Sequence, residues 1–295
     1  MAGVPRFRLR CWGARGTIPS PGPHTLRYGG NTSCIEVRTA GGSRVILDAG
    51  SGIRALGIEM FEEPRSLGNC GTTHLFLTHR HLDHVMGLPY FQPFRSINES
   101  VVLRCGNATP EQFADLAATL LGPPLFVPVP TLREVLRVLP CLTQAPMEVD
   151  ATCRVHKFEA RHNGGAGIFR LDDAAGAAIA FAPDNELAYA SDEPSVQQWR
   201  SALANSLRGV ALLIHDATFN DEEIGRYGGW GHSSAEEATR FAIECNATSL
   251  LLFHHDPDRS DDAVDALVAT CRAMAEQANS RLQISAAYEG MSLTV

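Results

Sequence analysis

The sequence THRHLDH, residues 78–84, decides the fold class of this chain. It follows the apolar stretch HLFL, so its polar side chains lie in a loop that leaves a buried strand. A turn can aim His79 and His81 at one point, while Asp83 and His84 on the next bend can face a second point. Imidazole nitrogens and carboxylate oxygens suit Zn²⁺, and also Mn²⁺ or Fe²⁺. The cluster therefore predicts metal binding rather than a solvated polar loop.

One loop cannot surround two metal ions, so further ligands should come from other strand ends. His162 follows a strand-like stretch and precedes the turn residues Asn163-Gly164-Gly165. Asp184 ends the apolar run AAIAFAPD, and His254 ends SLLLFH. Side chains just past buried strands are where an α/β sheet builds its site. Each residue is a weak signal alone, but together with residues 78–84 they supply the missing ligands.

The rest of the chain alternates short apolar strands with amphipathic helices, which predicts a single α/β domain over residues 1–295. The expected strands are Arg6–Trp12, Ser33–Thr39, Arg44–Asp48, His74–Thr78, Val101–Cys105, Ala177–Pro183, Val210–His215 and Ser249–His254. The expected helices are Pro110–Leu121, Pro194–Ser206, Ser233–Cys245 and Ser260–Ala278. Residues 107–150 contain a proline-rich part from about residue 120 and are interpreted as an insertion or lid, with a purely structural excursion as the alternative.

Two helix starts carry capping signals. Ser233 followed by Glu236 has the spacing of a capping box. The segment that begins at Ser260 opens with Asp261 and Asp262, which places acids at the positive end of the helix dipole. Both patterns predict stable helices late in the chain.

The composition favours a soluble enzyme with a small substrate. The 295 residues are 44% hydrophobic, and the net charge of −8 gives no general attraction to polyphosphate. The N-terminus lacks the apolar run of a signal peptide, and no stretch of about 18 apolar residues predicts a membrane span. We therefore expect a cytoplasmic protein that does not bind membranes. Its eight scattered cysteines are expected to be buried thiols, and they are Cys11, Cys34, Cys70, Cys105, Cys141, Cys153, Cys245 and Cys271.

The HRHLDH stretch resembles the HxHxDH motif of the metallo-β-lactamase superfamily, and Asp48 in ILDAG resembles the aspartate of that superfamily's first motif. The resemblance runs from about Trp12 to His255. It implies a four-layer αββα sandwich, with two mixed β-sheets flanked by helices, and two divalent metal ions, with zinc favoured. By this resemblance Asp48 orients the loop from behind the ligands. The implied ligands are His79, His81 and His162 for one metal, Asp83, His84 and His254 for the other, and Asp184 as the bridge.

Two further segments point to one branch of the superfamily. HDATF, residues 215–219, resembles the HEAT motif of ribonuclease Z-like phosphodiesterases, and GHSS, residues 231–234, resembles their GHST motif. The resemblance implies a metal-bridging hydroxide that attacks phosphorus, with Asp83 orienting it or taking its proton. It also implies that Asp216 supports His232, which protonates the leaving oxygen. Asp216 stands where the motif has glutamate, which leaves the geometry of that pair open.

The favoured interpretation is a phosphodiesterase for a small, cyclic nucleotide-like diester, and three alternatives stay open. One is a tRNA 3′-processing endoribonuclease, although residues 120–150 lack the basic character of a tRNA-binding arm, so RNA is possible but not favoured. Another is a non-catalytic, metal-dependent ligand-binding protein, in which His232 only begins a helix. Lactonase, thioesterase and lactamase activities are also compatible with such a fold. The family resemblance further implies a homodimer.

Several other polar residues are left without an assigned role. Asn31, Thr32 and Ser33 lie in a glycine- and proline-rich stretch and either contact the site or form a structural loop. His255 and Asp256 adjoin a predicted ligand and are left undecided. The histidines without a motif context, interpreted as structural or surface residues, are His24, His74 and His156.

Overall fold

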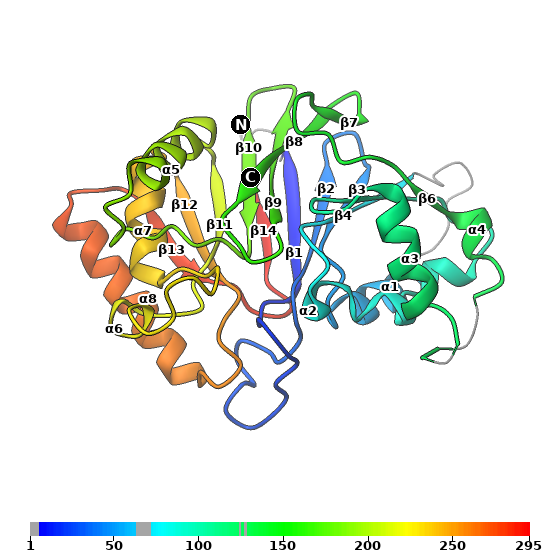
Figure 1. Cartoon of the computed structure of the whole chain (residues 1–295), viewed down its shortest axis with the longest axis horizontal. Coiled ribbons are helices and arrows are strands. Elements are labelled where there is room, and N and C mark those ends of the chain that lie inside the picture. Colours follow the sequence, from blue (N-terminus) through cyan, green and yellow to red (C-terminus); the bar gives the residue numbers. More distant parts are fainter. Residues whose placement is uncertain (1–5, 63–71, 124, 127–128) are drawn as a thin grey trace.

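The computed structural model describes residues 6–62, 72–123, 125–126 and 129–295, and in them two seven-stranded β-sheets pack face to face (Figure 1). In spatial order, the first sheet contains β14 (Ser292–Thr294), β1 (Phe7–Gly13), β2 (Cys34–Thr39), β3 (Arg44–Leu47), β4 (Thr73–Leu77), β5 (Val101–Cys105) and β6 (Leu136–Val138). The second contains β13 (Gln283–Ala286), β12 (Ser249–Phe253), β11 (Leu212–Asp216), β10 (Ala178–Ala182), β9 (Ala166–Asp173), β8 (Cys153–Ala160) and β7 (Met147–Asp150).

Each sheet is mixed, which sets where the loops gather. In the first sheet β3, β4, β5 and β6 pair in parallel, whereas β14, β1, β2 and β3 pair antiparallel. In the second sheet β10 to β13 pair in parallel and β7 to β10 antiparallel. The carboxyl ends of parallel strands share one edge of a sheet, so the loops that follow them can build a common site.

Helices cover the outer face of each sheet, and three apolar clusters hold the four layers together (Figure 1). The middle cluster joins the sheets, and in it the rings of Phe76 and Phe169 meet edge to face with centroids 5.3 Å apart. On one side lie α1 (Ile53–Glu62), α3 (Pro110–Leu120) and α4 (Leu132–Val135); on the other lie α5 (Pro194–Ser206), α7 (Ala235–Glu244) and α8 (Asp261–Gln277). The short helical turns are α2 (Leu82–Val85), α6 (Asp221–Ile224), η1 (Leu88–Tyr90) and η2 (Gln92–Arg95).

The αββα fold class expected from the sequence is confirmed, and all eight expected strands and four expected helices occur with small boundary shifts. The capping box expected at Ser233 and Glu236 is formed one residue later, by Ser234 and Glu237. Ser234, not Ser233, accepts a hydrogen bond from the N–H of Glu237, and the Glu237 side chain bonds back to Ser234. The hydroxyl of Ser233 instead donates to the carbonyl of Asn185 at 2.5 Å, which ties the start of α7 to the loop after β10.

Residues 107–150 are built into both sheets. They supply α3, whose Phe113 is fully buried, then α4, the edge strand β6 of the first sheet and the edge strand β7 of the second. Their role as a lid stays a prediction. In the described part of the chain no helix is long and apolar enough to cross a membrane. The seven cysteines described there are free thiols and six of them are buried, whereas Cys70 lies outside the described residues.

Candidate metal centre

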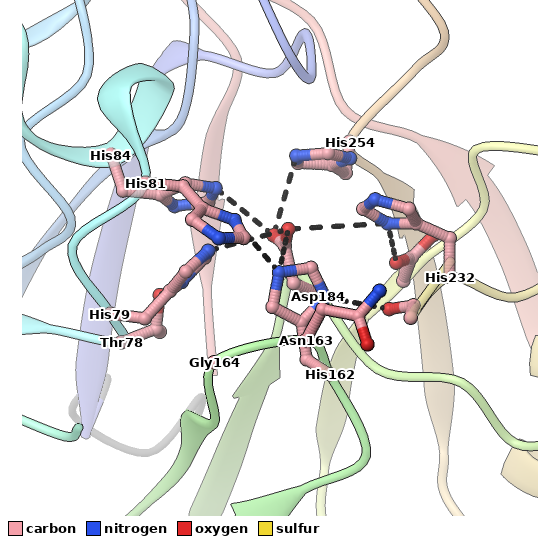
Figure 2. Close-up of polar contacts among 12 residues, drawn as sticks. Thr78, His79, His81, His84, His162, Asn163, Gly164, Asp184, His232 and His254 are labelled. Atoms are coloured by element: carbon pink, nitrogen blue, oxygen red, sulfur yellow. Dashed lines mark hydrogen bonds and ion pairs between the residues drawn. The ribbon is translucent and has the colours of Figure 1, made fainter. Parts of the chain in front are cut away.

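Seven predicted ligands come together at the loop edge of the two sheets (Figure 2). The loop after β4 carries His79, His81, Asp83 and His84, while His162, Asp184 and His254 follow β8, β10 and β12. In Figure 2 the histidines surround the carboxylate of Asp184. Four loops from both sheets therefore contribute to one cluster, as the sequence predicts.

Asp184 lies at the centre and turns one carboxylate oxygen to each half of the cluster. Its Oδ2 is 3.7 Å from Nε2 of His79 and 3.6 Å from Nε2 of His162. Its Oδ1 is 3.1 Å from Nε2 of His84 and 3.3 Å from Nε2 of His254. A buried carboxylate therefore lies between two groups of imidazoles.

Three groups of described side chains could hold a metal ion, and the third, which contains Asp184, His232 and His254, overlaps the two groups of predicted ligands. The first contains His79, His81, His162 and Asp184, and Nε2 of His162 lies 2.9 Å from Nδ1 of His81. The second contains Asp83, His84 and His254, and Oδ2 of Asp83 is 3.1 Å from Nε2 of both histidines. Within each group the candidate ligand atoms lie within 4.8 Å of one another. Nitrogen and oxygen sets of this kind suit zinc and other divalent transition metals.

Unpaired polar atoms support the fit of a metal to these residues. Among the described residues, the buried atoms His79 Nε2, His84 Nε2 and Asp184 Oδ1 have no partner in hydrogen-bonding geometry, although some of them lie close to one another. Buried polar atoms are almost always paired, because leaving one unpaired costs roughly 1–3 kcal/mol. All three atoms point into the cluster, so a divalent cation bound there would satisfy them together.

Asp48 organises the first loop from behind. Its carboxylate accepts hydrogen bonds from the backbone N–H and the hydroxyl of Thr78, at 2.7 and 3.0 Å, and lies 2.7 Å from Nδ1 of His84. The Thr78 hydroxyl lies 3.0 Å from Nδ1 of His79. Ring N–H groups held in this way leave Nε2 free as a metal ligand. Asp48 also adopts a left-handed backbone with φ of 62°, a strain typical of functional positions.

Asp216 and Thr218 repeat this arrangement on the second sheet. The Thr218 hydroxyl donates to Oδ1 of Asp216 at 2.9 Å and lies 3.0 Å from Nδ1 of His254. His254 is itself left-handed, with φ of 58°. A carboxylate, a threonine hydroxyl and an imidazole thus form the same chain behind His254 as behind His79.

His232 lies at the side of the cluster and shares Asp216. Its Nδ1 is 2.7 Å from Oδ2 of Asp216, and its ring stacks on that of His254 with centroids 5.0 Å apart. Burial opposes protonation of His232, but the neighbouring carboxylate of Asp216 outweighs it and raises the pKa of His232 to about 9. The pair is present with aspartate in place of the expected glutamate, and His232 therefore faces the site rather than only beginning a helix.

Electrostatics keep the carboxylates of the cluster ionised. Burial alone would raise the pKa of Asp184, but the imidazoles of His254, His84 and His79 hold it well below its usual range. The pKa of Asp83 is also lowered, since His84 and His254 outweigh the effect of burial. Burial lowers the pKa of His79, which keeps that imidazole neutral. The pKa of His84 moves the other way, because the carboxylates of Asp83, Asp184 and Asp48 outweigh the effect of burial and raise it. Ionised carboxylates and neutral imidazoles are the forms that bind metals, so metal binding would displace a proton from His84.

The remaining candidate residues have structural contacts. Nε2 of His255 donates to the carbonyl of Ala287 at 2.9 Å, and burial lowers the pKa of His255 to about 3, so it stays neutral. Asp256 accepts from the N–H of Asp258 within its own turn. The side chains of Asn31, Thr32 and Ser33 bond to Glu289, Ser51 and Asp48 respectively. His24 is exposed, His74 is buried and His156 pairs with Asp172.

Three supporting features were not assigned from the sequence. The hydroxyls of Thr78 and Thr218 orient two ligands, and only their places beside histidine and aspartate could have suggested this. Nδ1 of His162 bonds to the carbonyl of Gly231 at 2.9 Å, across 69 positions of sequence. The N–H of Thr17 donates to Oδ2 of Asp83 at 2.8 Å. Every residue has a backbone N–H or carbonyl group, so the residue type does not show which of these groups bonds to a ligand side chain.

Comparison with known proteins agrees with this geometry. A family model described as the β-lactamase superfamily domain matches residues 43–255, which is most of the chain. The chain belongs to the metallo-β-lactamase superfamily. Its matched region contains every candidate ligand and His232, so the family assignment and the cluster rest on the same part of the chain.

Individual members of the metallo-β-lactamase superfamily are similar to this chain over different lengths. Ribonuclease Z of Sulfurisphaera tokodaii is 42% identical over 69 residues, covering 23% of this chain and 22% of that protein. The chain thus matches only about a quarter of the length of the ribonucleases Z. The metallo-β-lactamase fold protein YhfI from Bacillus subtilis has a TM-score of 0.67 at 18% identity, over 99% of this chain and 100% of that one. The short form of human tRNase Z has a TM-score of 0.62 at 20% identity, over 97% and 98%.

Proposed function

We propose that this protein is a metal-dependent phosphodiesterase that hydrolyses a small, cyclic nucleotide-like phosphodiester. The observation that carries the proposal is the Asp216–His232 pair beside the metal cluster. With Nδ1 bound to Asp216 at 2.7 Å, Nε2 is the ring nitrogen left to act on a substrate. A phosphodiester with an alkoxide leaving group needs a proton at that oxygen, and an imidazole positioned in this way can supply it.

The metal ligands in this proposal are His79, His81 and His162 for one ion, Asp83, His84 and His254 for the other, and Asp184 between them. These residues would hold two divalent ions, with zinc favoured, and ions bound there would supply Lewis acidity toward the phosphoryl oxygens and lower the pKa of a water. Thr78, Asp48 and Thr218 fix the ligand rings. Such support behind the ligands preserves the geometry that the chemistry needs.

Protons move at two places in the proposed reaction. Asp83, an ionised carboxylate at the edge of the cluster, orients the nucleophilic water or accepts its proton. His232 donates the proton on Nε2 to the leaving oxygen, and Asp216 stabilises the imidazolium before transfer. The pKa of about 9 favours the protonated form of His232 at neutral pH.

The small substrate is inferred from the charge of the chain. The net charge is −8, and residues 107–150 contain two arginines and no lysine against five carboxylates. This segment gives little attraction to a polyanion the size of tRNA. The second candidate, a tRNA 3′-processing endoribonuclease, is favoured by the 42% identity to ribonuclease Z over 69 residues. Homodimer formation stays a prediction from the resemblance.

The test begins with elemental analysis of purified protein, followed by assays of the metal-loaded form. Bis-p-nitrophenyl phosphate, a panel of cyclic nucleotides and a precursor tRNA are compared with a β-lactam, a lactone and a thioester. We expect hydrolysis of phosphodiesters and metal-dependent recovery after chelation. The proposal is contradicted if metal-loaded protein hydrolyses none of the phosphodiesters. The second candidate is supported if the protein cleaves precursor tRNA at the discriminator position and does not act on small diesters.

A further inference from the structure

Trp230 is a large, exposed apolar side chain in the loop that leads to His232 of the candidate centre. Its relative exposure is 60%, although the backbone on both sides of it is held in place. It stands between Gly229 and Gly231, two residues before His232. Tryptophan combines a large apolar ring with a polar N–H group, and it is enriched at binding interfaces.

Four hydrogen bonds fix the backbone that carries Trp230. The two carboxylate oxygens of Glu186 accept from the N–H groups of Gly229 and Gly231, at 3.0 and 2.8 Å. The carbonyl of Gly229 accepts from Asn163 at 2.9 Å, and that of Gly231 from Nδ1 of His162, also at 2.9 Å. The loop is thus bonded directly to a candidate metal ligand.

The indole also has aromatic support. Its ring meets that of Tyr227 edge to face with centroids 5.1 Å apart, and the backbone N–H of Trp230 donates to the backbone carbonyl of Tyr227 at 3.1 Å. Tyr227 in turn stacks on Phe219 with centroids 4.4 Å apart and an interplanar angle of 5°. Phe219 is buried beneath them and contacts the ring of His232 edge to face. The platform is therefore preformed, which reduces the entropy lost when a ligand binds.

We propose that Trp230 is a specificity-determining residue that stacks on the nucleobase of the substrate. The inference rests on the proposed function and narrows its substrate class to diesters that contain a nucleoside. Base–aromatic stacking tolerates any base, because every base presents a π face. Since Trp230 shares a loop with His232, the base should belong to the part of the substrate that carries the leaving oxygen.

The test measures binding, so it does not depend on turnover. Isothermal titration of metal-loaded protein with AMP and with ribose 5-phosphate separates the base from the phosphate. We expect Trp230→Ala to weaken AMP binding about 5- to 150-fold, the range that corresponds to a stacking energy of roughly 1–3 kcal/mol. Binding of ribose 5-phosphate should change less than about twofold. Trp230→Phe should keep most of the AMP affinity, because it keeps a flat ring.

A matched control is Phe61→Ala, which removes another exposed aromatic ring, with 60% relative exposure, from α1 on the other helical layer. It should leave both affinities unchanged. Equal AMP affinity in wild type and Trp230→Ala overturns the inference, as does wild-type protein that binds AMP no better than ribose 5-phosphate. Dissociation of a dimer by Trp230→Ala with no change in AMP binding would assign the indole to an interface instead.

The binding data also separate this inference from the proposed function. If Trp230→Ala hydrolyses phosphodiesters as well as wild type and binds AMP with unchanged affinity, the proposed nucleobase contact is wrong, but the proposed phosphodiesterase activity stands. If AMP binding requires Trp230 but the protein hydrolyses no diester, the nucleotide-binding site is supported and the proposed phosphodiesterase activity is wrong.

Discussion

Oδ2 of Asp216 lies 2.7 Å from Nδ1 of His232, while Oδ1 of the same carboxylate accepts the hydroxyl of Thr218 at 2.9 Å. One buried side chain thus serves both the proposed proton donor and, through Thr218, a candidate metal ligand. The two branches can be tested separately, because His232 and Thr218 can be changed without altering Asp216.

Replacing His232 by alanine should preserve metal content and reduce hydrolysis of a diester with an alkoxide leaving group by about 10²- to 10⁴-fold, the usual contribution of general acid catalysis. The loss should be much smaller for bis-p-nitrophenyl phosphate, because p-nitrophenolate leaves without a proton. Parallel assays with both substrates and elemental analysis check this. An equal loss on both substrates, or a loss of metal, would show that His232 is a ligand rather than an acid.

Thr218→Val removes the hydroxyl that holds His254 but keeps the size and shape of the side chain. Nδ1 of His254 then loses its partner, and we expect metal affinity to fall about 10- to 100-fold, as for other groups that orient metal ligands. Competition with a chromophoric chelator measures the change. Thr218→Ser retains the hydroxyl and should behave nearly as wild type. Unchanged affinity in Thr218→Val would mean that the hydroxyl plays no part in orienting His254.

Gly231→Ala should displace His162. Gly231 has φ of +88°, and a Cβ atom there would lie 2.4 Å from Nδ1 of His162. We expect a reduced metal content and at least a tenfold loss of metal affinity, of the order seen when a ligand's support is removed. Gly228→Ala in the same loop is the control, since a Cβ there meets nothing within 4 Å. If both variants keep full metal content, the loop does not position His162.

His81→Ala should lose metal and activity together. Nδ1 of His81 lies 2.9 Å from Nε2 of His162, and His81 belongs to the first group of candidate ligands. Its removal should therefore weaken metal binding by more than the roughly 100-fold loss that is typical of supporting residues. Elemental analysis after gel filtration measures the metal that remains. His156→Ala, a histidine paired with Asp172 outside the cluster, should keep it. Full metal content in His81→Ala would exclude His81 as a ligand.

Metal removal should also lower thermal stability. Metal ions that bind only the folded state stabilise it. At a free metal concentration of about 1,000 times the Kd, they add roughly 4 kcal/mol to the free energy of unfolding. Chelated protein should therefore melt at a lower temperature, and added zinc should restore the original value. Calorimetry with and without chelator checks this, with His81→Ala expected to show a smaller difference. Identical melting curves would argue against tight metal binding.

The fold class, the buried strands and the loops that carry the candidate ligands could be predicted from the sequence. These features are local. VALLIH and SLLLFH are nearly continuous apolar runs because both faces of β11 and β12 are buried, and HRHLDH concentrates polar side chains where a strand ends. Strands such as β8 were missed because its alternating CRVHKFEA pattern is only half apolar. The Ser233 cap was placed one residue early because Ser233 and Ser234 are both followed by a glutamate at the capping-box spacing.

How the loops share their partners could not be predicted from the sequence, because it depends on how the chain packs. Asp184 turns one oxygen to each group of histidines, Thr218 connects Asp216 to His254, and the Gly231 carbonyl holds His162. These contacts join residues as far apart in sequence as His79 and Asp184, and the bond to His162 uses a backbone carbonyl, which every residue has. Their geometry depends on how the two sheets pack, because that packing sets the distance between loops that no local pattern relates.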